Sequence, residues 1–223
     1  GLAARQAAAA GGTCPPGNPL QILSDAIQDG WVPRVGSGIY FHRQELSRSL
    51  EGRSVDLLTL TNASEQQLSG ATQEEMPPEL NMPGSPPVCF PGKPIVFFSA
   101  RVHPGETPGQ FAWLGALRHL LSDDPRAVAL RDRFVFKLVP ILNPDGVARG
   151  HYRTNTKGLN LNRFYDKPVW EDHEAVWSTK QILMHWSQNG RLLLYVDFHA
   201  HANRAGCFFL ANRIKGPAQA WNT

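Results

Sequence analysis

The stretch that decides the fold is PIVFFSARVHPGETP, residues 94–108. Its first half, Ile95–Ala100, is a continuous apolar run behind a proline, which predicts a β-strand buried on both faces. Its second half leads into a helix, because Thr107 can cap a helix N-terminus and Pro108 suits the first helical position. Apolar residues then recur at helical spacing, at Phe111, Leu114, Leu117 and Leu121. A buried strand followed by an amphipathic helix is typical of an α/β protein.

Similar patterns continue on both sides of this unit. Segments rich in β-branched and aliphatic residues predict further strands at Val55–Thr61, Phe134–Leu142, Leu192–Phe198 and Cys207–Leu210. Helical patterns cover 125–132 and 171–186, and residues 40–53 look partly helical. Strands that alternate with helices predict an α/β fold with a mixed, mostly parallel sheet flanked by helices on both faces.

Two segments lack such patterns. Residues 1–39 begin with an aperiodic mixture of alanine, glycine and proline, which predicts a disordered or poorly ordered flank. Residues 62–94 are rich in serine, glutamine, glutamate and proline, which predicts a long surface loop. The predicted folded domain is therefore 40–223, with this loop inside it.

The composition excludes several classes of protein. Charged residues make up 18% of the 223 residues, too few for a disordered chain, and the net charge of +3 leaves no polybasic arm for nucleic acid. No run approaches the roughly 20 apolar residues of a membrane span. Three widely spaced cysteines argue against a disulfide framework. We therefore expect a cytosolic protein that binds neither nucleic acid nor a membrane.

His103 and Glu106 lie in the loop that follows Ile95–Ala100. Active sites of open α/β sheets lie beyond the carboxyl ends of strands, where this loop is expected. An imidazole and a carboxylate are good zinc ligands, and two histidines with one glutamate form a hydrolytic zinc site when a fourth position stays open. The plainer alternative is a surface histidine beside a glutamate favoured by a helix N-terminus.

A second cluster, Asp197, His199 and His201, lies at the end of the strand Leu192–Phe198. Because side chains alternate along a strand, all three are expected on the same face. One histidine could supply a third ligand while its neighbours orient it. The spacing alone does not choose between His199 and His201. The alternative is a buried aspartate–histidine pair that binds no metal.

The third cluster contains Arg153, Asn162 and Arg163, and it follows a turn predicted at 143–146. An arginine fork matches a carboxylate with two parallel hydrogen bonds, so Arg163 beside the Asn162 amide suits a terminal carboxylate. Arg153 could stabilise an oxyanion. Each arginine taken alone is more simply a solvated loop residue.

Together the three clusters resemble the zinc metallocarboxypeptidases, and more narrowly their cytosolic branch. The resemblance covers roughly residues 40–212 and rests on five motifs in the expected order. They are RVHPGETP (101–108), LNPDGV (142–147), RGHYRT (149–154), LNLNR (159–163) and DFHAH (197–201). The resemblance implies an α/β/α carboxypeptidase fold, of which residues 40–223 would be the N-terminal part with the C-terminal part missing.

The resemblance also implies roles for individual residues. The implied ligands of one zinc ion are His103, Glu106 and His199, which selects the first histidine of the pair. Arg153 would polarise the scissile carbonyl, and Asn162 with Arg163 would clamp the terminal carboxylate of the substrate. Asn160 stands where the digestive members have an aspartate that supports a zinc-bound histidine.

The motif details look closest to the cytosolic subgroup that removes glutamates, including branch-point glutamates, from polyglutamylated tubulin. The implied partners are polyglutamylated tubulin and other glutamate-rich protein tails. The implied location is the cytoplasm, with the nucleus and microtubules as further sites. The family's general base is a glutamate well downstream of the third ligand, whereas no acidic residue lies between 198 and 223. We therefore expect an incomplete piece that lacks efficient catalysis.

Two alternatives use the same residues. One is a zinc amidohydrolase that deacylates small N-acyl amino acids, with the same ligands in a closed pocket. The other is a zinc-binding or interaction module without catalysis, which the missing glutamate favours for this chain. Metal analysis together with glutamate release from a glutamyl peptide separates these readings.

Overall fold

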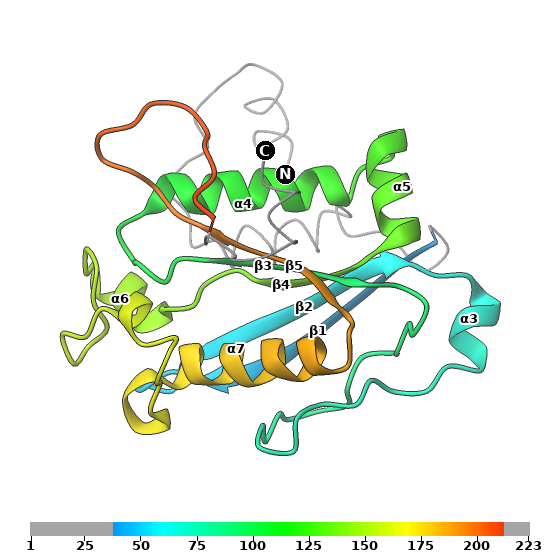
Figure 1. Ribbon diagram of the computed structural model, residues 1–223, viewed down its shortest axis with the longest axis horizontal. Helices are drawn as coiled ribbons and strands as arrows, with labels where there is room; N and C mark the ends of the chain where they lie inside the picture. The colour runs from blue at the N-terminus through cyan, green and yellow to red at the C-terminus, as the bar shows by residue number, and fades with distance from the viewer. Residues whose placement is uncertain (1–37, 212–223) are drawn as a thin grey trace, which may run out of the picture.

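The computed structural model describes residues 38–211, so the predicted flank 1–39 lies almost entirely outside it. Its strands form one mixed sheet in the order β1-β2-β4-β3-β5 (Figure 1). They are β1 (Ile39–Arg48), β2 (Ser54–Asn62), β3 (Ile95–Ala100), β4 (Val135–Val139) and β5 (Leu192–Phe198). The pairs β1–β2 and β2–β4 are antiparallel, whereas β3 pairs in parallel with both β4 and β5. This confirms the predicted mixed sheet.

The helices cover the two faces of the sheet. They are α3 (Glu65–Ser69), α4 (Thr107–Leu120), α5 (Pro125–Arg133), α6 (Pro144–Arg149) and α7 (Trp170–Gln188), with a 3-10 turn η1 at Leu161–Arg163. Helix α4 lies on one face and α7 on the other (Figure 1). Because side chains alternate along a strand, Leu58 packs in the core with Trp113 of α4, and Leu57 packs in the core with Trp186 of α7. None of the helices within 38–211 is long and apolar enough to cross a membrane.

The parallel part of the sheet places the candidate site. Strands β3, β4 and β5 run in the same direction, so the loops after their carboxyl ends meet at one edge. In Figure 1 this edge lies beside α6. The three clusters of polar residues found in the sequence follow these three strands, and the fold therefore brings them to the same edge.

The partly helical interpretation of residues 40–53 is wrong, because Ile39–Arg48 forms strand β1. It pairs with β2 from Ile39↔Asn62 to Arg48↔Ser54 across a tight turn that contains Gly52. Gly52 has a φ of 78°, in the left-handed region that glycine adopts without strain. Pairing with a neighbouring strand overrides the local helical pattern of this segment.

Helix α4 forms as predicted but begins and packs differently. Glu106, not Thr107, is its N-cap residue, and no side chain caps it because the Glu106 carboxylate is bound to histidines. Phe111 was predicted on the buried stripe but is 53% exposed, while Trp113 and Leu117 are buried against the sheet. The buried stripe is therefore rotated relative to the predicted one.

Three boundaries also differ from the sequence predictions. The segment Cys207–Leu210 is not a strand, and Phe209 is 90% exposed, because this segment pairs with no strand of the described sheet. The predicted strand Phe134–Leu142 ends at Val139. The predicted turn at 143–146 is the start of α6, where the Asn143 side chain accepts a hydrogen bond from the Gly146 amide.

The loop 62–94 is not only a surface connection. Its Leu80 and Phe90 belong to the core on the α7 side, and its Glu74 is 3% exposed. Glu74 is paired with the fully buried ammonium of Lys137 on β4 and lies 2.6 Å from Arg191 Nη1. This buried ion pair fastens the loop to the middle of the sheet.

The Glu74→Leu variant is expected to lower the free energy of unfolding by about 3–5 kcal/mol, because it leaves Lys137 charged and unpaired in the interior. Urea unfolding measures the change, and Glu75→Leu, at the exposed neighbouring position, is the matched control. A loss no larger for Glu74→Leu than for the control would show that the ion pair does not hold the loop.

Candidate active site

The three predicted metal ligands lie together in the structure. One ligand atom each from His103, Glu106 and His199 lies within 4.8 Å of the other two. His103 and Glu106 come from the loop between β3 and α4, and His199 directly follows β5. The two imidazole rings meet edge to face, with centroids 5.0 Å apart. Metal ligation by these residues stays a prediction, and their convergence from two distant loops is a finding.

Glu106 occupies the centre of this group. Its Oε1 lies 2.8 Å from Nδ1 of His103, and its Oε2 lies 3.0 Å from Nδ1 of His199. Oε2 also accepts a hydrogen bond from the Ala200 amide at 2.8 Å. Burial opposes ionisation of this carboxyl, but the hydrogen bonds outweigh it and hold the Glu106 pKa well below its usual range. The carboxylate is therefore ionised and fixed in place between the two rings.

The Nε2 atom of each histidine contacts a side chain outside this group of three residues. Nε2 of His103 lies 3.0 Å from Oδ1 of Asn160, and Nε2 of His199 lies 2.6 Å from Oδ2 of Asp197. Asn160 Oδ1 also accepts a hydrogen bond from the Asn162 amide, and because an amide oxygen only accepts, His103 Nε2 is the donor in its contact with this oxygen. In both rings Nδ1 is therefore the nitrogen that faces Glu106.

The carboxylates around these rings favour a positive charge at this position. Both nitrogens of His199 face carboxylates, one from Asp197 and one from Glu106. Burial opposes a charge on this ring, but the hydrogen bonds to the two carboxylates outweigh it and raise the His199 pKa to about 10. A proton supplies the positive charge when no metal is bound, and a zinc ion would replace it. Two imidazoles and a carboxylate are a donor set that suits zinc.

Close backbone contacts explain why glycines flank the ligands. The Gly105 amide donates a hydrogen bond to the Tyr152 carbonyl at 2.8 Å, and a Cβ on Gly105 would lie 2.7 Å from that oxygen. A Cβ on Gly109 would lie 3.0 Å from the His199 backbone. The loop after β3 thus packs closely against both the 149–154 segment and the residue that follows β5.

The structure also brings the predicted substrate residues near this group. Nη1 of Arg153 lies 3.5 Å from Oε1 of Glu106, on a partly exposed side chain. Asn162 is linked to His103 through Asn160, which accepts hydrogen bonds from both. Arg163 is exposed, and its Nη1 donates to the Asn162 carbonyl at 3.2 Å. The roles of these three residues stay predictions.

The alternative ligand His201 is not part of the group. Its Nδ1 accepts a hydrogen bond from the Asn203 amide at 3.2 Å, and its ring packs edge to face on Phe208. Strand β5 ends at Phe198, so the alternation of side chains that pointed to His201 no longer applies there. The geometry therefore favours the first histidine of the pair.

Two further buried side chains near the site, Asp145 and Ser99, were not predicted from the sequence. Asp145, in the LNPDGV motif, binds Ser49 at 2.6 Å and Arg53 at 2.7 Å, which ties the β1–β2 turn to α6. Ser99 of β3 binds the carboxylate of Asp197 at 2.6 Å. The role of Asp145 could have been suspected, because it is an acidic residue inside the LNPDGV motif. The role of Ser99 could not, because its contact with Asp197 depends on strand register.

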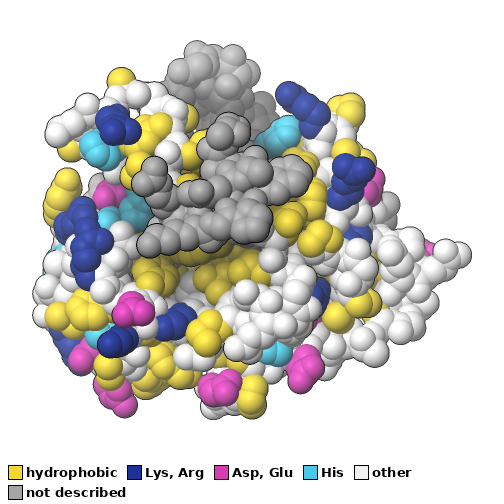
Figure 2. Space-filling view, in the orientation of Figure 1, with side chains coloured by type: hydrophobic (Ala, Val, Ile, Leu, Met, Phe, Trp, Pro, Cys, Tyr) yellow, Lys and Arg dark blue, Asp and Glu magenta, His cyan; other side chains and the backbone are white. Residues whose placement is uncertain are grey.

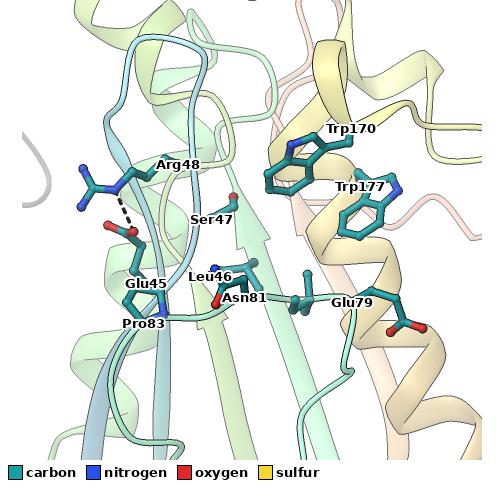
Figure 3. A pocket seen from close by; sticks show the side chains of 10 residues that line it. Glu45, Leu46, Ser47, Arg48, Glu79, Asn81, Pro83, Trp170 and Trp177 are labelled. Carbon is teal, nitrogen blue, oxygen red and sulfur yellow. Dashed lines mark hydrogen bonds and ion pairs between the residues drawn. The ribbon is translucent and has the colours of Figure 1, made fainter.

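A cavity of about 570 Å³ lies elsewhere in the domain, between β1, residues 79–83 and the start of α7 (Figure 3). Trp170 and Trp177 form one wall and Ser47 lies across from them on β1, whereas the Arg48 guanidinium points away from them toward Glu45. None of its lining residues belongs to the metal-binding group. The candidate active site is therefore separate from this cavity.

Comparison with known proteins agrees with this geometry. The family model described as zinc carboxypeptidase matches residues 39–217, well over half of the chain. The chain belongs to the zinc carboxypeptidase family. This confirms the resemblance drawn from the five motifs, and it implies zinc for a site whose donor set fits that metal.

The relatives place the chain within this family. It is 48% identical over 156 residues to the human cytosolic carboxypeptidase-like protein 5, covering 69% of this chain and 17% of that protein. It is 36% identical over 187 residues to human cytosolic carboxypeptidase 1, covering 83% of this chain and 14% of that protein. The chain thus spans less than a fifth of the length of these curated relatives.

Solved structures share the fold. A metallo-carboxypeptidase from Burkholderia cenocepacia is 29% identical, with a TM-score of 0.56 over 80% of this chain and 40% of that one. A putative carboxypeptidase A from Shewanella denitrificans is 28% identical, with a TM-score of 0.56 over 82% of this chain and 39% of that one. The mixed sheet with helices on both faces is therefore a carboxypeptidase fold.

Proposed function

We propose that the full-length protein to which this chain belongs is a zinc-dependent carboxypeptidase that removes C-terminal or branch-point glutamates from polyglutamylated proteins such as tubulin. The observation that carries the proposal is the meeting of His103, Glu106 and His199 at one edge of a carboxypeptidase sheet. Its cytosolic relatives support the cytoplasm as the place of action.

When bound, zinc would polarise the scissile carbonyl and lower the pKa of a water molecule toward neutrality. The residues of this chain hold the candidate ligands in place. Glu106 and the two histidines are held in their orientation by Asn160, Asp197 and the Ala200 amide. A preformed arrangement of this kind needs no rearrangement at the moment of reaction.

Arg153 is proposed to meet the negative charge that develops on the carbonyl oxygen. Its guanidinium lies 3.5 Å from Glu106 and is partly exposed, so it is next to the metal-binding group and open to a substrate. A donor aimed at a developing oxyanion stabilises the transition state more than the ground state. Arg153 would therefore act on turnover rather than on binding.

Asn162 and Arg163 are proposed to hold the free carboxylate at the end of the substrate. Both lie on the 3-10 turn η1, which Asn160 fastens to His103. The exposed guanidinium of Arg163 can form two parallel hydrogen bonds to a carboxylate. A requirement for a free carboxylate is what makes such an enzyme an exopeptidase.

The charges on the surface add little to the choice of a glutamate-rich substrate. Figure 2 shows Lys and Arg side chains interspersed with other groups over this face of the molecule. Scattered basic residues with a net charge of only +3 give modest attraction for an acidic tail. The choice of glutamate and the choice of tubulin therefore both rest on the resemblance of the motifs.

The Arg163→Ala variant of the full-length protein is expected to lower kcat/KM for a polyglutamylated peptide by about 10- to 150-fold, mainly through KM. This corresponds to the loss of a hydrogen bond to a charged group, about 1.5–3 kcal/mol. Free glutamate released from the peptide measures the rate. Arg126→Ala is the matched control, since Arg126 is an exposed arginine on α5.

The same assay tests the substrate class. A peptide whose terminal carboxylates are converted to amides is expected to be cleaved much more slowly than the peptide with free carboxylates. Equal cleavage of both peptides would contradict an exopeptidase that recognises a carboxylate. One bound zinc without any glutamate release from the full-length protein would instead support the non-catalytic zinc-binding module.

A further inference from the structure

A chain of hydroxyl groups leads from the sheet to the side chain that holds His199. Ser99 Oγ lies 2.6 Å from Oδ1 of Asp197 and 3.1 Å from the Tyr195 hydroxyl. The Tyr195 hydroxyl lies 3.3 Å from the hydroxyl of Tyr165. The other oxygen of Asp197, Oδ2, lies 2.6 Å from Nε2 of His199. Both oxygens of this carboxylate are therefore engaged.

The direction of these hydrogen bonds follows from proton counting. An ionised carboxylate only accepts, so Ser99 must donate its single hydroxyl proton to Asp197. Ser99 then accepts from Tyr195, and Tyr195 accepts from Tyr165. Burial, and then the nearby Asp197 charge, raise the pKa of the Tyr195 hydroxyl, so it keeps its proton. Every donor in the chain thus points toward Asp197.

Strand register builds this arrangement. Ser99 of β3 and Asp197 of β5 are direct partners in the parallel pairing. Asp197 lies two residues before His199, so its carboxylate can reach back to the ring of that histidine. Tyr165 follows the η1 turn and lies two residues after Arg163. The hydroxyl chain therefore joins a candidate metal ligand to the segment that carries the proposed substrate clamp.

The two histidines are supported by different charges. His103 donates to Asn160, which is a neutral amide, whereas His199 is paired with a carboxylate. A carboxylate behind an imidazole fixes the ring orientation and makes the opposite nitrogen a stronger donor to a metal. An amide fixes the orientation with a smaller effect on donor strength. The site is therefore asymmetric, with the stronger support on His199.

We propose that Asp197 is a positioning residue, which holds His199 with Nδ1 toward Glu106 and strengthens its bond to the metal, while Ser99, Tyr195 and Tyr165 lock the Asp197 carboxylate in place. The proposal rests on the metal-binding role of the group described above. It assigns Asp197 no contact with the substrate.

The test compares metal binding by variants of the full-length protein, with cobalt(II) as the probe metal. Asp197→Asn keeps the shape and a hydrogen-bond acceptor but removes the charge, and Ser99→Ala keeps the charge but removes the lock. Asp172→Asn is the matched control, because Asp172 is an aspartate of α7 that is paired with Lys157. Competition with a chelator gives the dissociation constant, and the visible absorption of bound cobalt reports ligand geometry.

Asp197→Asn is expected to weaken cobalt binding by about 10- to 100-fold and to shift the visible bands, as loss of an outer partner of a ligand does. Ser99→Ala is expected to weaken binding in the same direction by a smaller factor. With saturating metal, KM for the glutamyl peptide should stay near the wild-type value in both. Tyr195→Phe removes one hydroxyl alone and is expected to lower the cobalt affinity slightly. It provides the test if Asp197→Asn does not fold.

Wild-type affinity and an unchanged cobalt spectrum in Asp197→Asn would overturn the positioning role. If Asp197→Asn does not fold, wild-type affinity in both Ser99→Ala and Tyr195→Phe would overturn it. These results differ from a failure of the proposed function. That failure would appear as normal cobalt binding in the wild-type protein without release of glutamate.

Discussion

Replacement of Glu106 by glutamine in the full-length protein is expected to abolish zinc binding and peptide cleavage together. The carboxylate contacts Nδ1 of both His103 and His199, and its negative charge balances the cation that these rings require. The loss of zinc affinity should exceed about 100-fold, the upper end of the cost of losing an outer partner of a ligand. Metal content after dialysis and glutamate release are the two measurements.

Two variants frame this result. Glu106→Asp keeps the charge on a shorter side chain and should retain more metal than Glu106→Gln. Glu79→Gln removes an exposed carboxylate from the loop 62–94 and is the control for loss of charge alone. If Glu106→Gln bound one zinc with wild-type affinity, Glu106 would not be a ligand.

Replacement of Arg153 by alanine is expected to lower kcat by about 100-fold or more, with zinc content unchanged. The guanidinium lies beside Glu106, and it is not a possible ligand because it has no lone pair to offer a metal. Its removal should therefore affect the charged transition state and leave the metal in place. Steady-state release of glutamate, with metal content measured on the same samples, separates the two effects.

Arg149→Ala is the matched control for this variant, because Arg149 lies in the same RGHYRT motif. Its guanidinium is paired with Glu51 at 2.8 Å, so it is committed to the β1–β2 turn. Wild-type turnover in Arg153→Ala, or an equal loss in Arg149→Ala, would show that Arg153 has no special part in the reaction.

The meeting of His103, Glu106 and His199 was predictable because a general rule governs parallel strands. Loops that follow such strands meet at one edge of the sheet, so ligands far apart in sequence come together. The rule gives no distance and does not choose between His199 and His201. The resemblance to the zinc carboxypeptidases selects His199, and the end of β5 at Phe198 explains why the alternation of side chains does not extend to His201.

The rest was set by contacts between segments, which a single sequence does not display. Strand β1 owes its form to pairing with β2, and its own residues look partly helical. Glu74 is buried against Lys137, although it belongs to the loop 62–94, whose composition is typical of a surface segment. The bond from Ser99 to Asp197 exists because these two residues are register partners. Such pairings are properties of the assembled sheet.

The most direct test of the account is the position of the metal itself. Anomalous diffraction at the zinc absorption edge, on crystals of the full-length protein, locates the ion and the atoms around it. The account predicts one zinc bound by Nδ1 of His103, the carboxylate of Glu106 and Nδ1 of His199. A zinc ion held by His201 or bound away from these three residues, or a crystal of metal-loaded protein without zinc at this edge of the sheet, would contradict it.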